Sequence, residues 1–393
     1  MGQWQEKVSE TVQHPEVQAV FKRIDSMMEE IASLTTRISE VAAPSFRERN
    51  RAELVAQLMR DAGLSSVHID AATSAIGVYP AADGHEGHAV ALAAHIDTVF
   101  PDATDVSVRR DGNWLIGPGV GDNSANVAAI LLLGKLLNEF GFKLEREVII
   151  LGTAGMEGLG DLRGMKQFMR DYRDRVKTVI PVDGVLGSIV HKAVGSRRFR
   201  VHTKGTGGHS FAVFGVPSAV HGLGRMIAAI ADIQVPAEPK TTYNVGVIGG
   251  GTSINTIANS AWMEIDMRSE STEELAKLEA EVRGAIDTAA AATGIEYDIA
   301  VVGDRPCGEW PAESDLVQML QAVYRSFDIE PRLRAGSNDA NVPISLGYEA
   351  ATISAKVGEG GHTMNDSVHL NSMIPGLKTL FLAVIMAAGW QPA

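Results

Sequence analysis

Residues 90–99 read VALAAHIDTV, a short apolar run that ends in a histidine and an aspartate. An apolar run of this length, bounded by polar residues, is typical of a buried strand. A second such run, VIILG at 148–152, follows a long apolar segment of helical character at 124–140. Strands that alternate with helices in this way indicate an α/β domain with a doubly wound sheet.

The same alternation continues on both sides of these two runs. Apolar residues at helical spacing and short apolar or alternating stretches predict the remaining elements of this domain. They are helices over 15–62, with a break at the Ala-Pro-Ser of 43–45, and over 162–172, and strands at 67–70, 76–79, 179–182 and 351–354.

The pattern changes between residues 193 and 306. It becomes strand, helix, strand, strand, helix, strand, which is the order of the ferredoxin-like split motif. The second helix begins with the capping box Ser271-Thr272-Glu273-Glu274. Because mixed helix and strand return after Pro306, we expect this block to be inserted. The predicted domains are therefore a mixed-sheet domain of 1–192 and 307–393, and an inserted α+β domain of 193–306.

Composition limits the classes of function and the compartment. A net charge of −13 argues against a general nucleic-acid surface, which needs positive charge. No run approaches the roughly 18 apolar residues that span a bilayer, and the first ten residues are polar, unlike a signal peptide. Cys307 is the single cysteine. We therefore expect a cytoplasmic enzyme with no membrane or nucleic-acid partner.

Five metal-ligand residues lie where predicted strands end or a helix begins. Because a doubly wound sheet gathers the ends of its strands at one edge, we expect them to meet there. Two imidazoles and three carboxylates suit one or two Zn, Mn or Co ions, which can acidify a bound water. The five residues are His95, Asp122, Glu157, Asp183 and His362.

Each of these residues alone also has a structural interpretation. A single histidine at a strand end is more often structural, and Asp122 before a helix could be only an N-cap. Five such residues, each at the end of a predicted strand or the start of a helix, favour a metal site. Asp97 lies two residues after His95 on an extended chain, so it points the same way and is predicted to orient the imidazole.

These segments resemble the dinuclear-metal aminoacylase and carboxypeptidase family, which includes peptidase T, glutamate carboxypeptidase and succinyl-diaminopimelate desuccinylase. The resemblance spans nearly the whole chain in family order, and its loop at 336–341 is also matched. It implies a zinc-exopeptidase-like catalytic domain in which Asp122 bridges two metals. One metal would also take His95 and Asp183, and the other Glu157 and His362.

The resemblance also implies roles for the inserted domain, as a lid and a surface for a homodimer or higher homo-oligomer. Gly207-Gly208-His209-Ser210 is similar to the family motif whose histidine reaches a neighbouring subunit's site and stabilises the oxyanion. Asn255 and Arg268 resemble the family's clamp for a substrate carboxylate, a role that the two-pronged guanidinium suits. For Arg268, an exposed strand residue is the alternative interpretation.

The chain departs from the family at one catalytic position. The family has two adjacent glutamates where this chain has Met156-Glu157, and Met156 occupies the place of the general base and acid. A thioether cannot exchange a proton at physiological pH, and that exchange is worth roughly 10²- to 10⁴-fold in rate.

Three interpretations of the departure stay open. The first is a hydrolase that cleaves an amide or peptide C–N bond in a small carboxylate-bearing substrate by a metal-bound hydroxide, with Met156 natural or a laboratory substitution. The second is an aminohydrolase that deaminates an activated aromatic amine, such as a nitroanthranilate. The third is a metal- or ligand-binding protein without turnover.

Overall fold

The two runs that predicted the sheet form its central strands, β3 (Ala89–His95) and β6 (Val148–Thr153), and every residue of both is buried. They lie side by side in parallel, with β7 (Val176–Pro181) on the other side of β3. Burial on both faces explains why these strands read as continuous apolar runs. The complete order is β1-β2-β6-β3-β7-β17. The outer strands are β1 (Ser65–Ile69), β2 (Ala75–Tyr79) and β17 (Glu349–Ala350).

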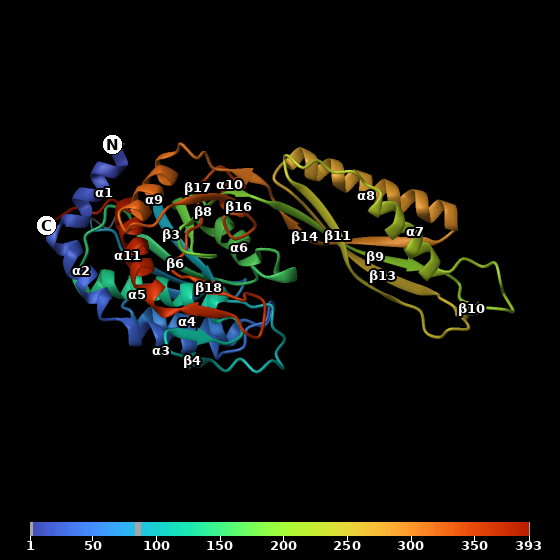
Figure 1. The fold of residues 1–393 in the computed structure, drawn as a ribbon, viewed down its shortest axis with the longest axis horizontal. Helices are drawn as coiled ribbons and strands as arrows, with labels where there is room; N and C mark the ends of the chain where they lie inside the picture. The colour runs from blue at the N-terminus through green and yellow to red at the C-terminus, as the bar shows by residue number, and fades with distance from the viewer. Residues whose placement is uncertain (1–2, 83–87, 393) are drawn as a thin grey trace. The chain divides into compact units, whose positions relative to one another are not determined.

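Helices pack on this sheet, as the α/β prediction requires. Helices α3 (Met28–Ser39), α4 (Arg49–Asp61) and α5 (Ala125–Phe140) contact one another and lie together along one side of it (Figure 1). The long apolar pattern at 124–140 thus becomes a nearly fully buried helix. The remaining helices of this unit are α1 (Gln3–Gln13), α2 (Pro15–Asp25), α6 (Arg163–Tyr172), α9 (Asp315–Arg325), α10 (Asn341–Ser345) and α11 (Leu370–Ala387).

The computed structural model describes residues 3–82 and 88–392. The chain divides into one unit of Met1–Lys192 with Glu309–Ala393 and a second of Ala193–Gly308. Several short strands were not predicted, and the strand expected at 351–354 is reduced to β17 and isolated bridges at Thr352 and Ile353. The short strands are β4 (Arg109–Asp111), β5 (Trp114–Ile116), β8 (Ser188–Ala193), β15 (Gly308–Glu309), β16 (Arg332–Gly336), β18 (Gly358–Glu359) and β19 (Ser367–His369).

The second unit has the predicted strand and helix order. Its four-stranded antiparallel sheet has the order β11-β13-β9-β14, and α7 and α8 pack against β9 and β13. The predicted cap is present, because Ser271 Oγ accepts a hydrogen bond from Glu274 N. A small ribbon of β10 (Gly208–His209) and β12 (Thr256–Ile257) is additional. The other elements are β9 (Gly195–Lys204), α7 (Ala219–Ala231), β11 (Thr241–Gly250), β13 (Ser260–Ser269), α8 (Thr272–Thr293) and β14 (Glu296–Arg305).

Within the described residues, helix α11 is the one candidate for a membrane-spanning segment by length and mean hydropathy. However, 67% of it is buried inside the protein. It has polar positions, among them Asn371 and Lys378, so it is not one uninterrupted apolar run. Its burial identifies it as a core helix of this unit.

The packing of α11 gives a stability test. A Cβ at Gly376 would lie 1.8 Å from the backbone oxygen of Ala355, so Gly376→Ala forces the helix away from its neighbour. We expect a loss of about 3 kcal/mol in the free energy of unfolding, at the upper end for overpacked cores. Gly284→Ala in α8 is the matched control, because a Cβ there meets nothing within 4 Å. It should stabilise by up to about 1 kcal/mol. Urea unfolding measures the free energy of unfolding of both variants. A Gly376→Ala variant more stable than Gly284→Ala would contradict this account.

Candidate metal centre

Three parallel strands end at the same edge of the sheet and present the first candidate ligands there. His95 is the last residue of β3, Glu157 lies four residues after the end of β6, and Asp183 lies two residues after β7. Asp122 comes from the turn before α5, and His362 from the loop after β18. The carboxyl ends of parallel strands are where such folds place their sites.

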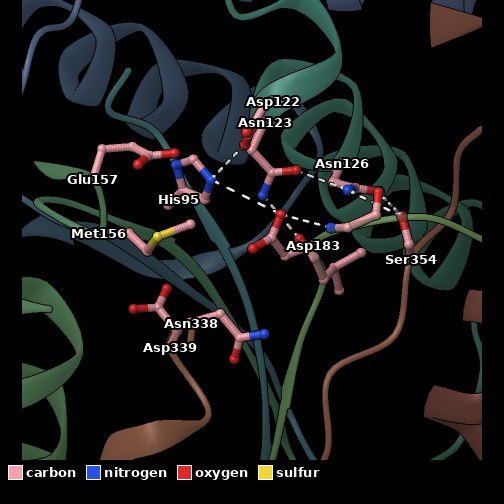
Figure 2. A network of polar contacts seen from close by, with 12 residues as sticks. His95, Asp122, Asn123, Asn126, Met156, Glu157, Asp183, Asn338, Asp339 and Ser354 are labelled. Atoms are coloured by element: carbon pink, nitrogen blue, oxygen red, sulfur yellow. Dashed lines mark hydrogen bonds and ion pairs between the residues drawn. The ribbon is translucent and has the colours of Figure 1, made fainter. Parts of the chain in front are cut away.

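The five residues meet as two groups of three that share Asp122. The first group is His95, Asp122 and Asp183, and the second is Asp122, Glu157 and His362. Within each group the potential ligand atoms all lie within 4.8 Å of one another. Figure 2 shows His95, Asp122, Asp183 and Glu157 gathered around one space.

Asp122 turns one carboxylate oxygen to each group. Its Oδ1 lies 3.1 Å from His95 Nε2, and its Oδ2 lies 3.3 Å from His362 Nε2. His362 Nε2 is also 3.1 Å from Glu157 Oε1, while His95 Nε2 is 4.0 Å from Asp183 Oδ1. This is the arrangement of a carboxylate that bridges two cations.

The charges of the site fit divalent cations. Burial lowers the pKa of His95, but hydrogen bonds to Asp122 and Asp97 outweigh it and raise that pKa well above its ordinary value. Hydrogen bonds to Asp122 and Glu157 raise the pKa of His362 to about 10. The clustered carboxylates therefore hold protons on both imidazoles. Because histidine and carboxylate oxygen are preferred ligands of Zn and Mn, cations can take the place of these protons.

Asp97 has a wider role than the predicted one. The backbone oxygen of Asp97 is closer to His95 Nδ1, at 3.0 Å, than the carboxylate, at 3.6 Å. The carboxylate itself accepts hydrogen bonds from the backbone N–H groups of Met156 and Glu157, one on each oxygen, and from the Ser45 hydroxyl. Asp97 thus holds the Glu157 turn as well as the His95 ring.

Replacing Asp97 by asparagine tests this link. Asparagine keeps only one acceptor oxygen, so one of the two N–H groups at Met156 and Glu157 would face an amide N–H₂. We expect Asp97→Asn to weaken metal affinity by about 10- to 100-fold, as for other partners of metal ligands. Isothermal titration with Zn or Mn measures it. Unchanged affinity would contradict the role.

Further residues that support the ligands were not anticipated from the sequence. Asp366 Oδ2 accepts hydrogen bonds of 2.9 Å from Gly121 N and Asp122 N. A Cβ at Gly121 would lie 2.5 Å from Asp366, so only glycine allows this approach. Asn126, drawn with Ser354 in Figure 2, donates to Asn123 and accepts from Ala355 N. These contacts join the Asp122 turn to the segment after β17.

Met156 is buried next to the candidate ligands. Its exposed fraction is 7%, and Figure 2 shows its thioether on the same side of the site as Glu157 and His95. The structure thus places a side chain that cannot exchange protons next to the space between the ligands.

The three predicted residues of the inserted block do not form one cluster. His209 and Asn255 are brought together, because β10 pairs with β12 and the backbone N–H of Ser210 donates to the backbone oxygen of Asn255. Arg268 lies near the other end of β13, roughly 25 Å away along the strand. There its Nε donates to Asp266 at 2.6 Å. Asn255 and Arg268, the predicted carboxylate clamp, therefore do not lie together within this unit.

Comparisons with known proteins agree with the fold. The peptidase dimerisation domain model matches residues 192–294, and that of peptidase family M28 matches residues 76–203. A LysW-lysine/LysW-ornithine hydrolase of Saccharolobus solfataricus is 22% identical over 303 residues, which are 75% of this chain and 80% of that protein.

Solved structures show the same fold along nearly the whole chain. Aminopeptidase PepT from Bacillus cereus has a TM-score of 0.73 at 20% identity, covering 92% of this chain and 99% of its own. The di-peptidase Dug1p from Saccharomyces cerevisiae has a TM-score of 0.78 at 12% identity, covering 95% and 98%. The chain is thus similar to the M20 and M28 peptidases and to their dimerisation domain, and these likenesses support a metallohydrolase that acts on C–N bonds.

Proposed function

We propose that this protein hydrolyses an amide or peptide bond in a small carboxylate-bearing substrate with two divalent cations, Zn, Mn or Co. The observation that carries the proposal is the bridging geometry of Asp122, whose two oxygens face two separate ligand groups. His95 and Asp183 would complete the first cation site, and Glu157 and His362 the second.

The chemistry divides between the cations and the chain. Bound cations would acidify a water and polarise the carbonyl of the substrate. Asp97 and Asp366 hold the ligand turns, which keeps the donor atoms in place without substrate. Arg268, 40% exposed in its side chain, is the proposed contact for the substrate carboxylate, although Asp266 competes for it.

A homodimer is part of the proposal. The match to a peptidase dimerisation domain supports it, and so do the bulky apolar side chains near His209. Phe211 and Phe214 are 90% and 91% exposed, which is unusual for phenylalanine on a surface that meets only water. The proposal places His209 and Asn255, at the end of the sheet remote from the chain connections, in the site of the partner copy. The cytoplasm is the proposed compartment, since Cys307 is buried and has no disulfide partner.

A second candidate is favoured by Met156 alone. Hydrolytic deamination of an activated aromatic amine depends less on a strong general acid, because electron-withdrawing groups on the ring assist the attack. A protein that binds metal and ligand without turnover is the alternative from another class; it would use the same ligands around Asp122 and release no product.

One screen separates these candidates. The protein is loaded with Zn, Mn or Co and offered N-acyl amino acids, dipeptides and carboxylated aromatic amines, and products are read by mass spectrometry. We expect an acid and an amine in equal amounts. Ammonia released from an aromatic amine would replace the proposal by the second candidate, and bound metal with no product from any substrate would favour the binding protein.

A further inference from the structure

Asp339 is a buried carboxyl for which the site chemistry above has no use. It lies between β16 and α10 and is 4% exposed. Its Oδ2 accepts a 2.5 Å hydrogen bond from Thr153 Oγ1, whereas its Oδ1 has no hydrogen-bond partner among the described residues. A buried polar oxygen without a partner costs free energy, so each instance needs an explanation.

The position of Asp339 links it to the altered catalytic residue. Thr153 is the last residue of β6, three residues before Met156, and it pairs with His95 on β3. The carboxyl is therefore tied to the strand end that carries the site. Figure 2 shows the Asp339 side chain pointing toward the side chain of Met156.

We propose that Asp339 supplies the proton transfer that Met156 cannot, through a water held beside the thioether. This rests on the proposed hydrolysis. The oxygen of the attacking water bonds to the carbonyl carbon, and one of its protons passes through the water beside Met156 to Asp339. The C–N bond then breaks with its electron pair on nitrogen, and Asp339 returns the proton to that nitrogen. The products are an acid and an amine, and Asp339 ends ionised as it began.

The electrostatic surroundings of Asp339 suit this task. Burial raises its pKa to about 6, against the hydrogen bond from Thr153 and the charge of His95, which lower it. Asp97 and Asp183 are the acidic groups nearby, and both raise it. A carboxyl that titrates close to neutral pH can both accept and return a proton.

Kinetics of Asp339→Asn give the first test. We expect kcat on the best amide substrate to fall by about 100-fold, the lower end for a general base. The double variant Met156→Glu with Asp339→Asn should retain the kcat of Met156→Glu, because Glu at 156 would take over. A purely structural role of Asp339 would not be rescued in this way. Asp70→Asn is the matched control, since Asp70 Oδ2 is also buried without a partner but lies at the β1–β2 turn.

Infrared difference spectroscopy of wild type against Asp339→Asn gives a second test that needs no turnover. Without metal, we expect the stretching band of the protonated Asp339 carboxyl to disappear as the pH rises, with a midpoint near pH 6. Adding Zn or Mn should lower this midpoint, because the cations would lie close by. A midpoint unmoved by metal, or full activity in Asp339→Asn, would overturn the proposal. If wild type cleaves no amide, the proposed function fails, and the infrared midpoint still reports on Asp339.

Discussion

Replacing Met156 by glutamate in the Asp339→Asn background should raise amide hydrolysis by about 100-fold, the lower end of what a general acid–base group contributes. The new carboxylate would stand next to Glu157 at a position that is already buried against the site. The backbone hydrogen bond from residue 156 to Asp97 does not depend on the side chain, so the turn is kept. Steady-state kcat on N-acyl amino acids and dipeptides measures the gain.

Met156→Gln is the matched control for this experiment. Glutamine has nearly the shape of glutamate but cannot take up a proton, so in the same Asp339→Asn background it should not raise kcat. An equal gain in both variants would show that polarity rather than proton transfer matters. No gain from Met156→Glu on any amide would count against peptide or amide cleavage as the activity, and would favour the aromatic aminohydrolase.

Replacing Asp122 by asparagine should have the largest effect on metal binding. The two oxygens of Asp122 serve two ligand groups, and asparagine offers one neutral oxygen. We expect at least one cation to be lost, with metal affinity reduced by more than about 100-fold. This is a larger loss than the one expected for a residue that only supports a ligand. Metal content after dialysis, by inductively coupled plasma mass spectrometry, measures the loss.

Asp366→Asn serves as the control for that loss. A single oxygen of Asp366 accepts both backbone hydrogen bonds, from Gly121 and Asp122, so asparagine can keep both contacts. Its metal content should stay near wild type. The thermal midpoint of metal-free Asp122→Asn should fall, because the Asp122 carboxylate pairs with His362 and His95, and these contacts outweigh burial and hold its pKa well below its usual value. Two full equivalents of metal in Asp122→Asn would rule out the bridging role.

The sheet and the candidate ligands could be predicted because their signals are local. β3 and β6 are buried throughout, so they appear as apolar runs. His95 ends β3, Asp183 lies two residues after β7, and Glu157 lies four residues after β6. The strand, helix, strand, strand, helix, strand order of the inserted unit is equally visible in the sequence, since β9, β13 and α8 are ten or more residues long. Elements of this length carry enough periodicity to be recognised.

The supporting contacts could not be predicted, because they join residues far apart in the chain. Asp366 and Asp122 are separated by 244 positions, and Asp339 and Thr153 by 186. Nothing in either local sequence signals its partner. The sheet of β4, β5, β18 and β19 escaped notice for another reason: strands of two or three residues are shorter than any alternating pattern. Family resemblance grouped Arg268 with Asn255, whereas the register of β13 places Arg268 at the opposite end of the sheet.

The central claim is that the ligand groups sharing Asp122 would hold two cations, and that the protein hydrolyses an amide only with these cations bound. Its most direct test titrates the metal-free protein with Mn or Zn while following both bound metal and cleavage of one N-acyl amino acid. The account predicts that cleavage rises with metal, reaches its maximum at two equivalents per chain and disappears with a chelator. Cleavage that is complete at zero metal, or two bound equivalents with no cleavage of any amide, would contradict it.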